Sequence, residues 1–239
     1  MHCSQTGNEL AFLVSIEGTD GAGKRTQTAA VMKRLQDRGL KVGWFTFLQY
    51  EKSFVSRIII KYLNGDFEPT SYYHPIIRSL MFALERYEEK SKIQGLLELN
   101  DVIILDRYVA SNLAYQIAGA KAAERIEFVE LILGVELGVL ELQKPDLNVF
   151  LDIRPEVAQR NIARKPERNF LKEEYDNNES DIDLLRQSYE AYQYLIEKKI
   201  LGPWEVVECH APSDGDLLPQ EEISARIECS VLQHLPSDL

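Results

Sequence analysis

The chain has 239 residues, of which 45% are hydrophobic and 27% are charged. This balance supplies enough apolar side chains for a full core and excludes a disordered chain, and the low counts of glycine (13) and proline (9) exclude collagen-like and low-complexity sequences. The formal net charge of −11 makes nucleic acid and anionic membranes unfavourable partners, because like charges repel at long range.

The cysteines and the hydropathy pattern indicate the cellular setting. Cys3, Cys209 and Cys229 share no metal-ligand spacing, and their odd number argues against a disulfide framework. We therefore expect reduced thiols and a cytoplasmic protein. No apolar run reaches the roughly 18 residues that a membrane span requires, and residues 1–9 have the character of a flexible N-terminal extension.

Five short apolar, β-branched segments predict buried strands, at 11–17, 41–47, 101–106, 146–153 and 204–208. Helical spacing of apolar residues predicts helices at 26–38, 53–63, 75–92, 122–142, 155–165, 182–199 and 219–234, with a break of the fourth near Gly134 or Gly138. Strands that alternate with helices predict an α/β fold with a parallel sheet covered on both faces. Ligands of such sheets bind beyond the carboxyl ends of the strands.

A glycine-rich turn follows the first predicted strand and has the G-x-x-x-x-G-K pattern of a P-loop. Its glycines let backbone N–H groups converge on phosphate, and the lysine and the following helix N-terminus add positive charge. The predicted ATP site consists of Gly18, Thr19, Asp20, Gly21, Ala22, Gly23, Lys24, Arg25 and Thr26.

One position departs from the usual pattern. Arg25 follows Lys24 where Ser or Thr ordinarily ligates Mg²⁺. Either other groups hold the Mg²⁺, or Thr26, one place later, does part of this work. The N-K-x-D guanine motif of GTPases is absent from the sequence.

Several further motifs, together with the P-loop, resemble the thymidylate kinase (dTMP kinase) family. These motifs are Asp106-Arg107-Tyr108, Ser111 to Gln116, Phe82 to Arg86, Lys144 to Leu147, Phe150 to Asp152 and Pro155 to Ala158. The resemblance runs from about residue 10 to 235 in the family's order. It implies a P-loop NTPase fold of three α/β/α layers with a five-stranded parallel sheet and a mobile lid, in one domain spanning 10–239. It also implies phosphoryl transfer from ATP to dTMP with Mg²⁺, by a homodimer.

The resemblance implies a role for each matching residue. Lys24 bridges the transferring phosphoryl group, and Asp20 holds Mg²⁺ or the sugar 3′-hydroxyl. Asp106 suits Mg²⁺ or its water shell, and the guanidinium fork of Arg107 suits the acceptor phosphate. The predicted metal ligands are Asp20, Asp106 and Glu179.

The acceptor site is expected on the helices that follow. Phe82 and Arg86 lie at i and i+4 on one helix face, where the ring stacks on the base and the guanidinium donates to a thymine carbonyl. Asn112 suits the O/N–H edge of a pyrimidine, and Tyr115 lies on the same helix side beneath the deoxyribose. The predicted dTMP-binding residues are Asp20, Phe47, Tyr50, Phe82, Arg86, Arg107, Asn112 and Tyr115.

Leu48 and Gln49 replace the Pro-Arg pair that is common in the family. A positive charge is lost, and with the proline goes the reason for any special peptide geometry. Binding of the acceptor phosphate then depends more on Arg107, Tyr50 and Lys52.

Residues 154–172 carry six basic and two acidic residues, whereas 173–183 carry six acids and no base. In nucleoside monophosphate kinases an arginine-bearing lid closes over ATP, so we expect a lid at about 154–181. Gly21 stands where some members have a catalytic arginine, so the lid must supply one. The candidates are Arg160, Arg164 and Arg168. The longer stretch at 134–143 has no function that the sequence indicates.

Two alternatives remain open from the sequence. The Leu48-Gln49 change favours a kinase of the same fold with another acceptor, such as dUMP, a modified deoxynucleotide or a deoxynucleoside. Arg25 favours a nucleotide-binding regulatory module without turnover. The completeness of the second substrate site argues against the regulatory module.

Overall fold

The computed structural model describes residues 10–49, 52–67, 74–164, 181–211 and 216–237. The strands are β1 (Phe12–Glu17), β2 (Val42–Thr46), β3 (Val102–Asp106), β4 (Leu147–Asp152) and β5 (Trp204–Glu208). The helices are α1 (Lys24–Asp37), α2 (Phe54–Leu63), α3 (Pro75–Glu88), α4 (Lys90–Leu99), α5 (Val109–Ile117), α6 (Ala122–Leu133), the π-helical η2 (Gly134–Val139), α7 (Pro155–Ala163), α9 (Ile182–Glu197) and α10 (Gln220–His234).

The five strands form one parallel sheet in the order β2-β3-β1-β4-β5. β1 lies at the centre, with β3 on one side and β4 on the other, so the chain reverses its direction of winding around β1. This reversal opens the crevice in which doubly wound sheets bind nucleotides. The register places Asp106 beside Ile16 of β1 and Thr46 of β2, which brings three strand ends to one edge of the sheet.

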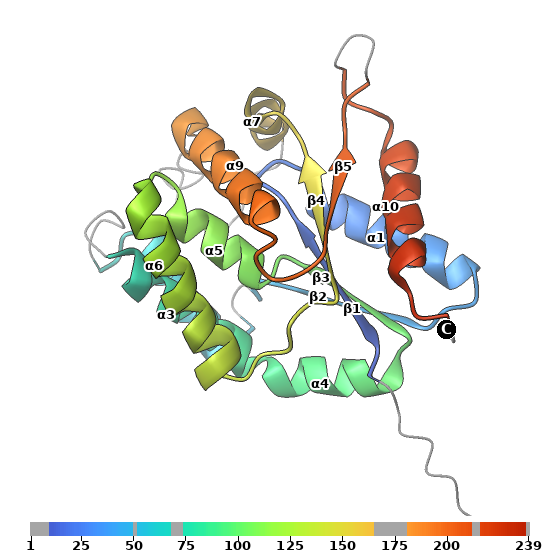
Figure 1. Cartoon of the computed structure of the whole chain (residues 1–239), viewed down its shortest axis with the longest axis horizontal. Helices are drawn as coiled ribbons and strands as arrows, with labels where there is room; N and C mark the ends of the chain where they lie inside the picture. Colours follow the sequence, from blue (N-terminus) through green and yellow to red (C-terminus); the bar gives the residue numbers. More distant parts are fainter. Residues whose placement is uncertain (1–9, 50–51, 68–73, 165–180, 212–215, 238–239) are drawn as a thin grey trace, which may run out of the picture.

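Helices cover both faces of the sheet, with α1 and α10 on one side and α3, α5, α6 and α9 on the other (Figure 1). Alternate residues of each strand feed opposite cores, as the two-residue period of a strand requires. Leu13 belongs to the core shared with α5 and α9, whereas Val14 belongs to the core shared with α1 and α10. The predicted three-layer α/β/α architecture and parallel five-stranded sheet are confirmed.

The helix predicted at 75–92 differs in its extent. The structure divides this region into α3 and α4, which meet at Glu89 and continue to Leu99. Glu89 is buried and forms an ion pair with Lys92, so the junction between the two helices is held inside the protein. The break expected near Gly134 is present as the change from α6 to η2. Among the described residues, no helix has the length and apolar character of a membrane span.

Candidate active site

The loop between β1 and α1 has the shape of a phosphate cradle. Gly21 and Gly23 both adopt positive φ angles of about 80°, which L-residues with side chains rarely adopt. Lys24 is buried at the first position of α1, and its Nζ donates to the carbonyl oxygens of Gly18 (3.0 Å) and Thr19 (2.7 Å). Its ammonium group is thus held across the loop, while Arg25 and Thr26 are exposed beside it.

The P-loop packs closely against α7, the first helix of the predicted lid. A Cβ atom on Gly21 would lie 2.1 Å from the carbonyl oxygen of Ala158 in α7, so no side chain fits at this position. Asn161, one turn further along α7, donates to the Gly21 carbonyl at 3.0 Å. The chain therefore has no room at Gly21 for the arginine that some family members carry there. The contact made by Asn161 was not foreseen from the sequence.

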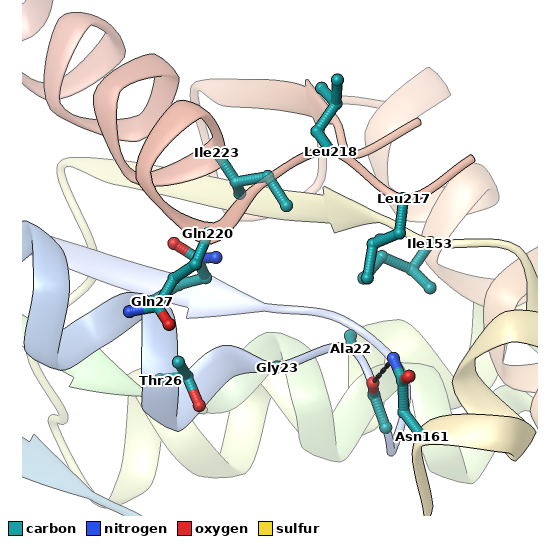
Figure 2. Close-up of a pocket in the computed structure, with 11 residues that line it drawn as sticks. Ala22, Gly23, Thr26, Gln27, Ile153, Asn161, Leu217, Leu218, Gln220 and Ile223 are labelled. Atoms are coloured by element: carbon teal, nitrogen blue, oxygen red, sulfur yellow. Dashed lines mark hydrogen bonds between the residues drawn. The ribbon is translucent and has the colours of Figure 1, made fainter. Parts of the chain in front are cut away.

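A pocket of about 280 Å³ opens on the α1 and α10 side of the cradle. Figure 2 shows apolar side chains across the pocket from Gly23 and Thr26, and the amides of Gln27 and Gln220 at one end. The apolar lining consists of Ile153, Leu217, Leu218 and Ile223. Gln27 Oε1 is buried and accepts no hydrogen bond within the described part of the chain. A flat apolar ring with polar edge groups fits such a pocket.

On the other side of the cradle, Asp20 and Arg107 form an ion pair between the loops that follow β1 and β3. Tyr115 donates its hydroxyl hydrogen to Asp20 Oδ2 at 2.6 Å, and Arg107 also lies 3.4 Å from the Gly18 carbonyl. Burial alone would lower the pKa of Arg107, but the charge of Asp20 together with Tyr115, Tyr192 and Asp106 outweighs burial and raises the pKa well above its usual value. The guanidinium therefore stays charged beside the phosphate cradle.

Glu17 is a fully buried carboxylate that organises this region, and it received no role in the sequence analysis. It accepts hydrogen bonds from the Tyr108 N–H (2.9 Å), the Ser111 hydroxyl (2.6 Å) and the Tyr192 hydroxyl (3.0 Å). Arg107 directly precedes Tyr108 and has a φ of 69°, a left-handed conformation. Glu17 thereby holds the strained turn that aims Arg107. Its position at the end of a buried strand is the one signal that could have singled it out.

Asp106, a predicted metal ligand, lies buried at the end of β3 and accepts a hydrogen bond from Thr46 Oγ1 at 3.3 Å. Within the described residues, no group of three or more His, Cys, Asp or Glu side chains lies close enough to hold a metal. Asp20 is also a predicted ligand, but both its oxygens have partners in Arg107 and Tyr115.

The predicted base-contacting residues lie together between α3, α5 and η2. Arg86 and Asn112 are both buried, and both bond to the fully buried Glu136 of η2. Phe82, one turn before Arg86, is half-buried. The structure thus gives residue 136, in the stretch without a predicted role, a central place in this cluster.

The segment after β2 differs from the sequence-based expectation in its peptide geometry and in the position of the Phe47 side chain. Phe47 and Leu48 are joined by a cis peptide bond, although no proline follows Phe47. The Phe47 ring is buried in the core, 5.9 Å from the Tyr108 ring, and does not line an open surface. The N–H of Gln49 donates to Glu85 at 2.7 Å, and burial raises the pKa of Glu85 to about 7.

Arg160 and Arg164, two of the three candidate lid arginines, lie near the end of α7 and four residues apart. Arg168, Glu179 and Tyr50 lie outside the described residues. Lys52 is exposed before α2.

A P-loop with a pocket on one flank, and an Asp20–Arg107 ion pair and a buried Arg86–Glu136–Asn112 cluster on the other, is the arrangement expected of a P-loop phosphotransferase with two substrates. The thymidylate kinase family model matches residues 16–202. The chain is 33% identical over 198 residues to a thymidylate kinase of Mycobacterium tuberculosis strain CDC 1551 / Oshkosh, which covers 82% of the chain and 91% of that relative. It is 29% identical over 191 residues to a thymidylate kinase of Paraburkholderia xenovorans strain LB400, covering 77% of the chain and 87% of that relative.

The chain belongs to the thymidylate kinase family, and it is an enzyme that transfers a phosphoryl group from ATP to dTMP. The resemblance drawn from the sequence motifs is confirmed.

Proposed function

We propose that this chain converts ATP and dTMP to ADP and dTDP through the residue roles assigned here. The observation that carries this proposal is the ion pair between Asp20 of the P-loop and Arg107, because it attaches the acceptor-phosphate cation directly to the donor-phosphate cradle. A substrate phosphate bound by Arg107 then lies next to the group that it must attack. Positioning of this kind supplies much of the catalysis in phosphoryl transfer.

On the donor side, the backbone of Gly18 to Gly23 and the N-terminus of α1 bind the ATP phosphates. The pocket between Ile153, Leu217 and Ile223 takes the adenine ring, and the Gln27 carbonyl accepts from its amino group. Lys24 neutralises the phosphoryl oxygens, where negative charge builds up during transfer.

Mg²⁺ is proposed as the metal. Oxygen donors suit it, and in kinases it is held by one or two carboxylates together with substrate phosphates and water. Asp106 fits this requirement, since its carboxylate lies at the edge of the sheet where the P-loop and the Arg107 turn meet. Bound Mg²⁺ would neutralise charge on the ATP phosphates.

On the acceptor side, Arg107 binds the dTMP phosphate and Asp20 receives the 3′-hydroxyl, with Tyr115 beneath the deoxyribose. Phe82 stacks on thymine, while Arg86 and Asn112 hydrogen-bond its edge. An oxygen of the dTMP phosphate attacks the γ-phosphorus of ATP in line, a new P–O bond forms, and the bond to the ADP oxygen breaks. No covalent enzyme intermediate forms.

We also propose that the segment at about 154–181 is the lid that closes over ATP. Arg160 and Arg164 belong to the end of α7, which already contacts the P-loop through Ala158 and Asn161. With Arg168 they are the candidates for the cation that stabilises the transition state. Glu179 is proposed to join the Mg²⁺ or phosphate network.

The test is ADP production from ATP and Mg²⁺ with dTMP, dUMP, dCMP or no acceptor, measured in parallel. We expect production with dTMP and less with dUMP. The neutral Gln49 favours one competing candidate, a kinase for another acceptor. A preference of tenfold or more for another acceptor would establish that candidate.

A homodimer and a cytoplasmic location are proposed with this function. Large apolar side chains are exposed on the packed pair α2 and α3, namely Phe54, Ile58, Ile77, Leu84 and Tyr87. A second copy covering this face would remove them from water, and Leu84→Glu should then give a monomer by light scattering.

The cysteines support the proposed cytoplasmic location. Cys209 and Cys229 are free thiols, the state that a reducing compartment maintains.

A further inference from the structure

Glu136 connects two side chains that come from different helices. Its Oε2 accepts a hydrogen bond from Nε of Arg86 at 2.7 Å, and its Oε1 accepts another from Nη2 of the same arginine. The Asn112 Nδ2 donates to that Oε1 at 2.7 Å. All three side chains are almost completely withdrawn from solvent, with relative exposures of 3% for Arg86, 4% for Asn112 and 0% for Glu136.

These contacts determine which way round the Asn112 amide lies. Its nitrogen faces two groups that can only accept, the Glu136 carboxylate and the Ser79 carbonyl oxygen at 3.0 Å. Both amide hydrogens are therefore used, and a flipped amide would set oxygen against oxygen. Asn112 Oδ1 is left as the polar atom that the side chain can offer to a ligand. Its protein neighbour, Gln116 Nε2, is at the long distance of 3.5 Å.

The same carboxylate orients Arg86. Nε and Nη2 of the guanidinium point at Glu136, so within the described structure Nη1 is the nitrogen that remains to serve a ligand. Because the guanidinium is planar, fixing two of its nitrogens fixes the direction of the third. The cluster then offers one donor from Arg86 and one acceptor from Asn112.

We propose that Glu136 is the positioning residue that sets the base specificity of the acceptor site, an inference that rests on the proposed function. A pyrimidine-2,4-dione such as thymine has an acceptor at O4 beside a donor at N3–H, which complements Arg86 Nη1 and Asn112 Oδ1. Cytosine has the reverse pattern, an amino group beside an N3 acceptor, and it would place donor against donor and acceptor against acceptor. Glu136 touches neither base and acts through the two residues that it holds.

The test compares kcat/KM for dTMP and dCMP in the wild-type enzyme and in Glu136→Gln. A neutral amide has one acceptor oxygen for the three donors, two from Arg86 and one from Asn112, so Asn112 is held less firmly and can turn to present its nitrogen to the base. We expect the dTMP-to-dCMP ratio to fall tenfold or more, through the KM of the acceptor, with the KM for ATP unchanged. A folded Glu136→Gln enzyme with a ratio within twofold of wild type would overturn the proposal.

The matched control is Glu228→Gln. Glu228 is also buried and also connects two side chains, here Arg34 and Arg38, but it lies between α1 and α10 on the opposite face of the sheet. Its replacement should leave the acceptor ratio unchanged. If it lowers the ratio as much as Glu136→Gln, the effect is a general loss of packing and the proposal fails.

The wild-type arm separates this inference from the proposed function. If wild type turns over no acceptor, the proposed function fails, and the same ratio is then taken from dissociation constants for dTMP and dCMP. A second measurement needs no folded variant at position 136. The side-chain amide hydrogens of Asn112, assigned by their loss in Asn112→Asp, should exchange slowly in the wild-type enzyme and stay protected when dTMP binds. Fast exchange of either hydrogen in the complex would overturn the proposal.

Discussion

Arg107 donates to the carboxylate of Asp20 across the loops that follow β3 and β1, two strands that are neighbours in the sheet. The two residues are 87 positions apart in the sequence. Their side chains are about one-fifth exposed, 21% for Arg107 and 20% for Asp20, so the pair faces the crevice and remains accessible to a substrate. The contact combines the cation proposed to bind the acceptor phosphate with the carboxylate proposed to receive a sugar hydroxyl.

A double-mutant cycle tests whether this pair acts as one unit on dTMP. We expect Arg107→Ala and Asp20→Asn each to lower kcat/KM for dTMP by on the order of 100-fold. The double variant should lose much less than the product of the two, since contacting residues are coupled. Arg226→Ala removes an exposed ion pair on α10 and should change kcat/KM less than twofold. Strict additivity of the two losses would reject a joint role.

Lys24→Ala should lower turnover by on the order of 100- to 1,000-fold, because the ammonium group held across the cradle has no substitute. The fold should remain intact, since Lys24 belongs to neither hydrophobic core. ADP release and far-UV circular dichroism measure the two effects. Lys33→Ala, an exposed lysine on the same helix, is the control and should match wild type. Wild-type turnover in Lys24→Ala would contradict the site assignment.

Local sequence signals were sufficient for the sheet and the cradle. Buried parallel strands are continuous apolar runs, and the P-loop depends on glycines at fixed spacing, so both can be read within about ten residues. Glu17, Glu136 and Asn161 were missed because their roles depend on partners far along the chain. Arg86 and Glu136, for example, are 50 residues apart, and nothing near Glu136 in the sequence marks it as buried.

Packing between distant segments also explains why the sequence did not indicate the peptide geometry after Phe47 or the burial of its ring. Loss of the family's proline removed the reason for a special peptide geometry after Phe47, yet the structure has a cis bond there. The family's role for Phe47 also did not predict its burial, because the packing of its ring against Phe45 and Tyr108 is decided by β2, β3 and α5 together. Sequence motifs identify residue types at a site, but only the packed fold decides which atoms are presented.

Gly21→Ala should both destabilise the protein and impair ATP use. The added Cβ would meet the Ala158 carbonyl oxygen at 2.1 Å, and φ is +79° at this position. We expect a loss of about 2 kcal/mol or more in the free energy of unfolding by urea, with a raised KM for ATP. Gly95→Ala is the control, because Gly95 is helical and a Cβ added there would meet nothing within 4 Å, and it should gain about 0.5–1 kcal/mol. Equal stability of the two variants would contradict the tight contact between the P-loop and α7.

The raised pKa of Glu85 predicts that the stability of the protein depends on pH. Burial raises its pKa from 4.5 to about 7, so between these values the folded chain holds a proton that the unfolded chain has released. Stability therefore falls as the pH rises through this window, and the loss is complete above about pH 7. The Gln of Glu85→Gln cannot ionise and can still accept from the Gln49 N–H. The unfolding free energy of this variant minus that of wild type should therefore rise by about 2 kcal/mol as the pH is raised from 5 to 8.5.

Glu228→Gln provides a comparison of opposite sign for the pH experiment. Burial opposes ionisation of Glu228, but its hydrogen bonds with Arg38 and Arg34 and the charges of these two arginines together outweigh burial, so its pKa is lowered in the folded state. The stabilisation that it contributes is present above the unfolded pKa of about 4.5 and is lost only as the pH falls below it. The difference between Glu228→Gln and wild type should therefore be nearly constant from pH 5 to pH 8.5. If the difference between Glu85→Gln and wild type is just as constant, Glu85 is already ionised in the folded protein at pH 5, and its burial beside Gln49 does not hold a proton.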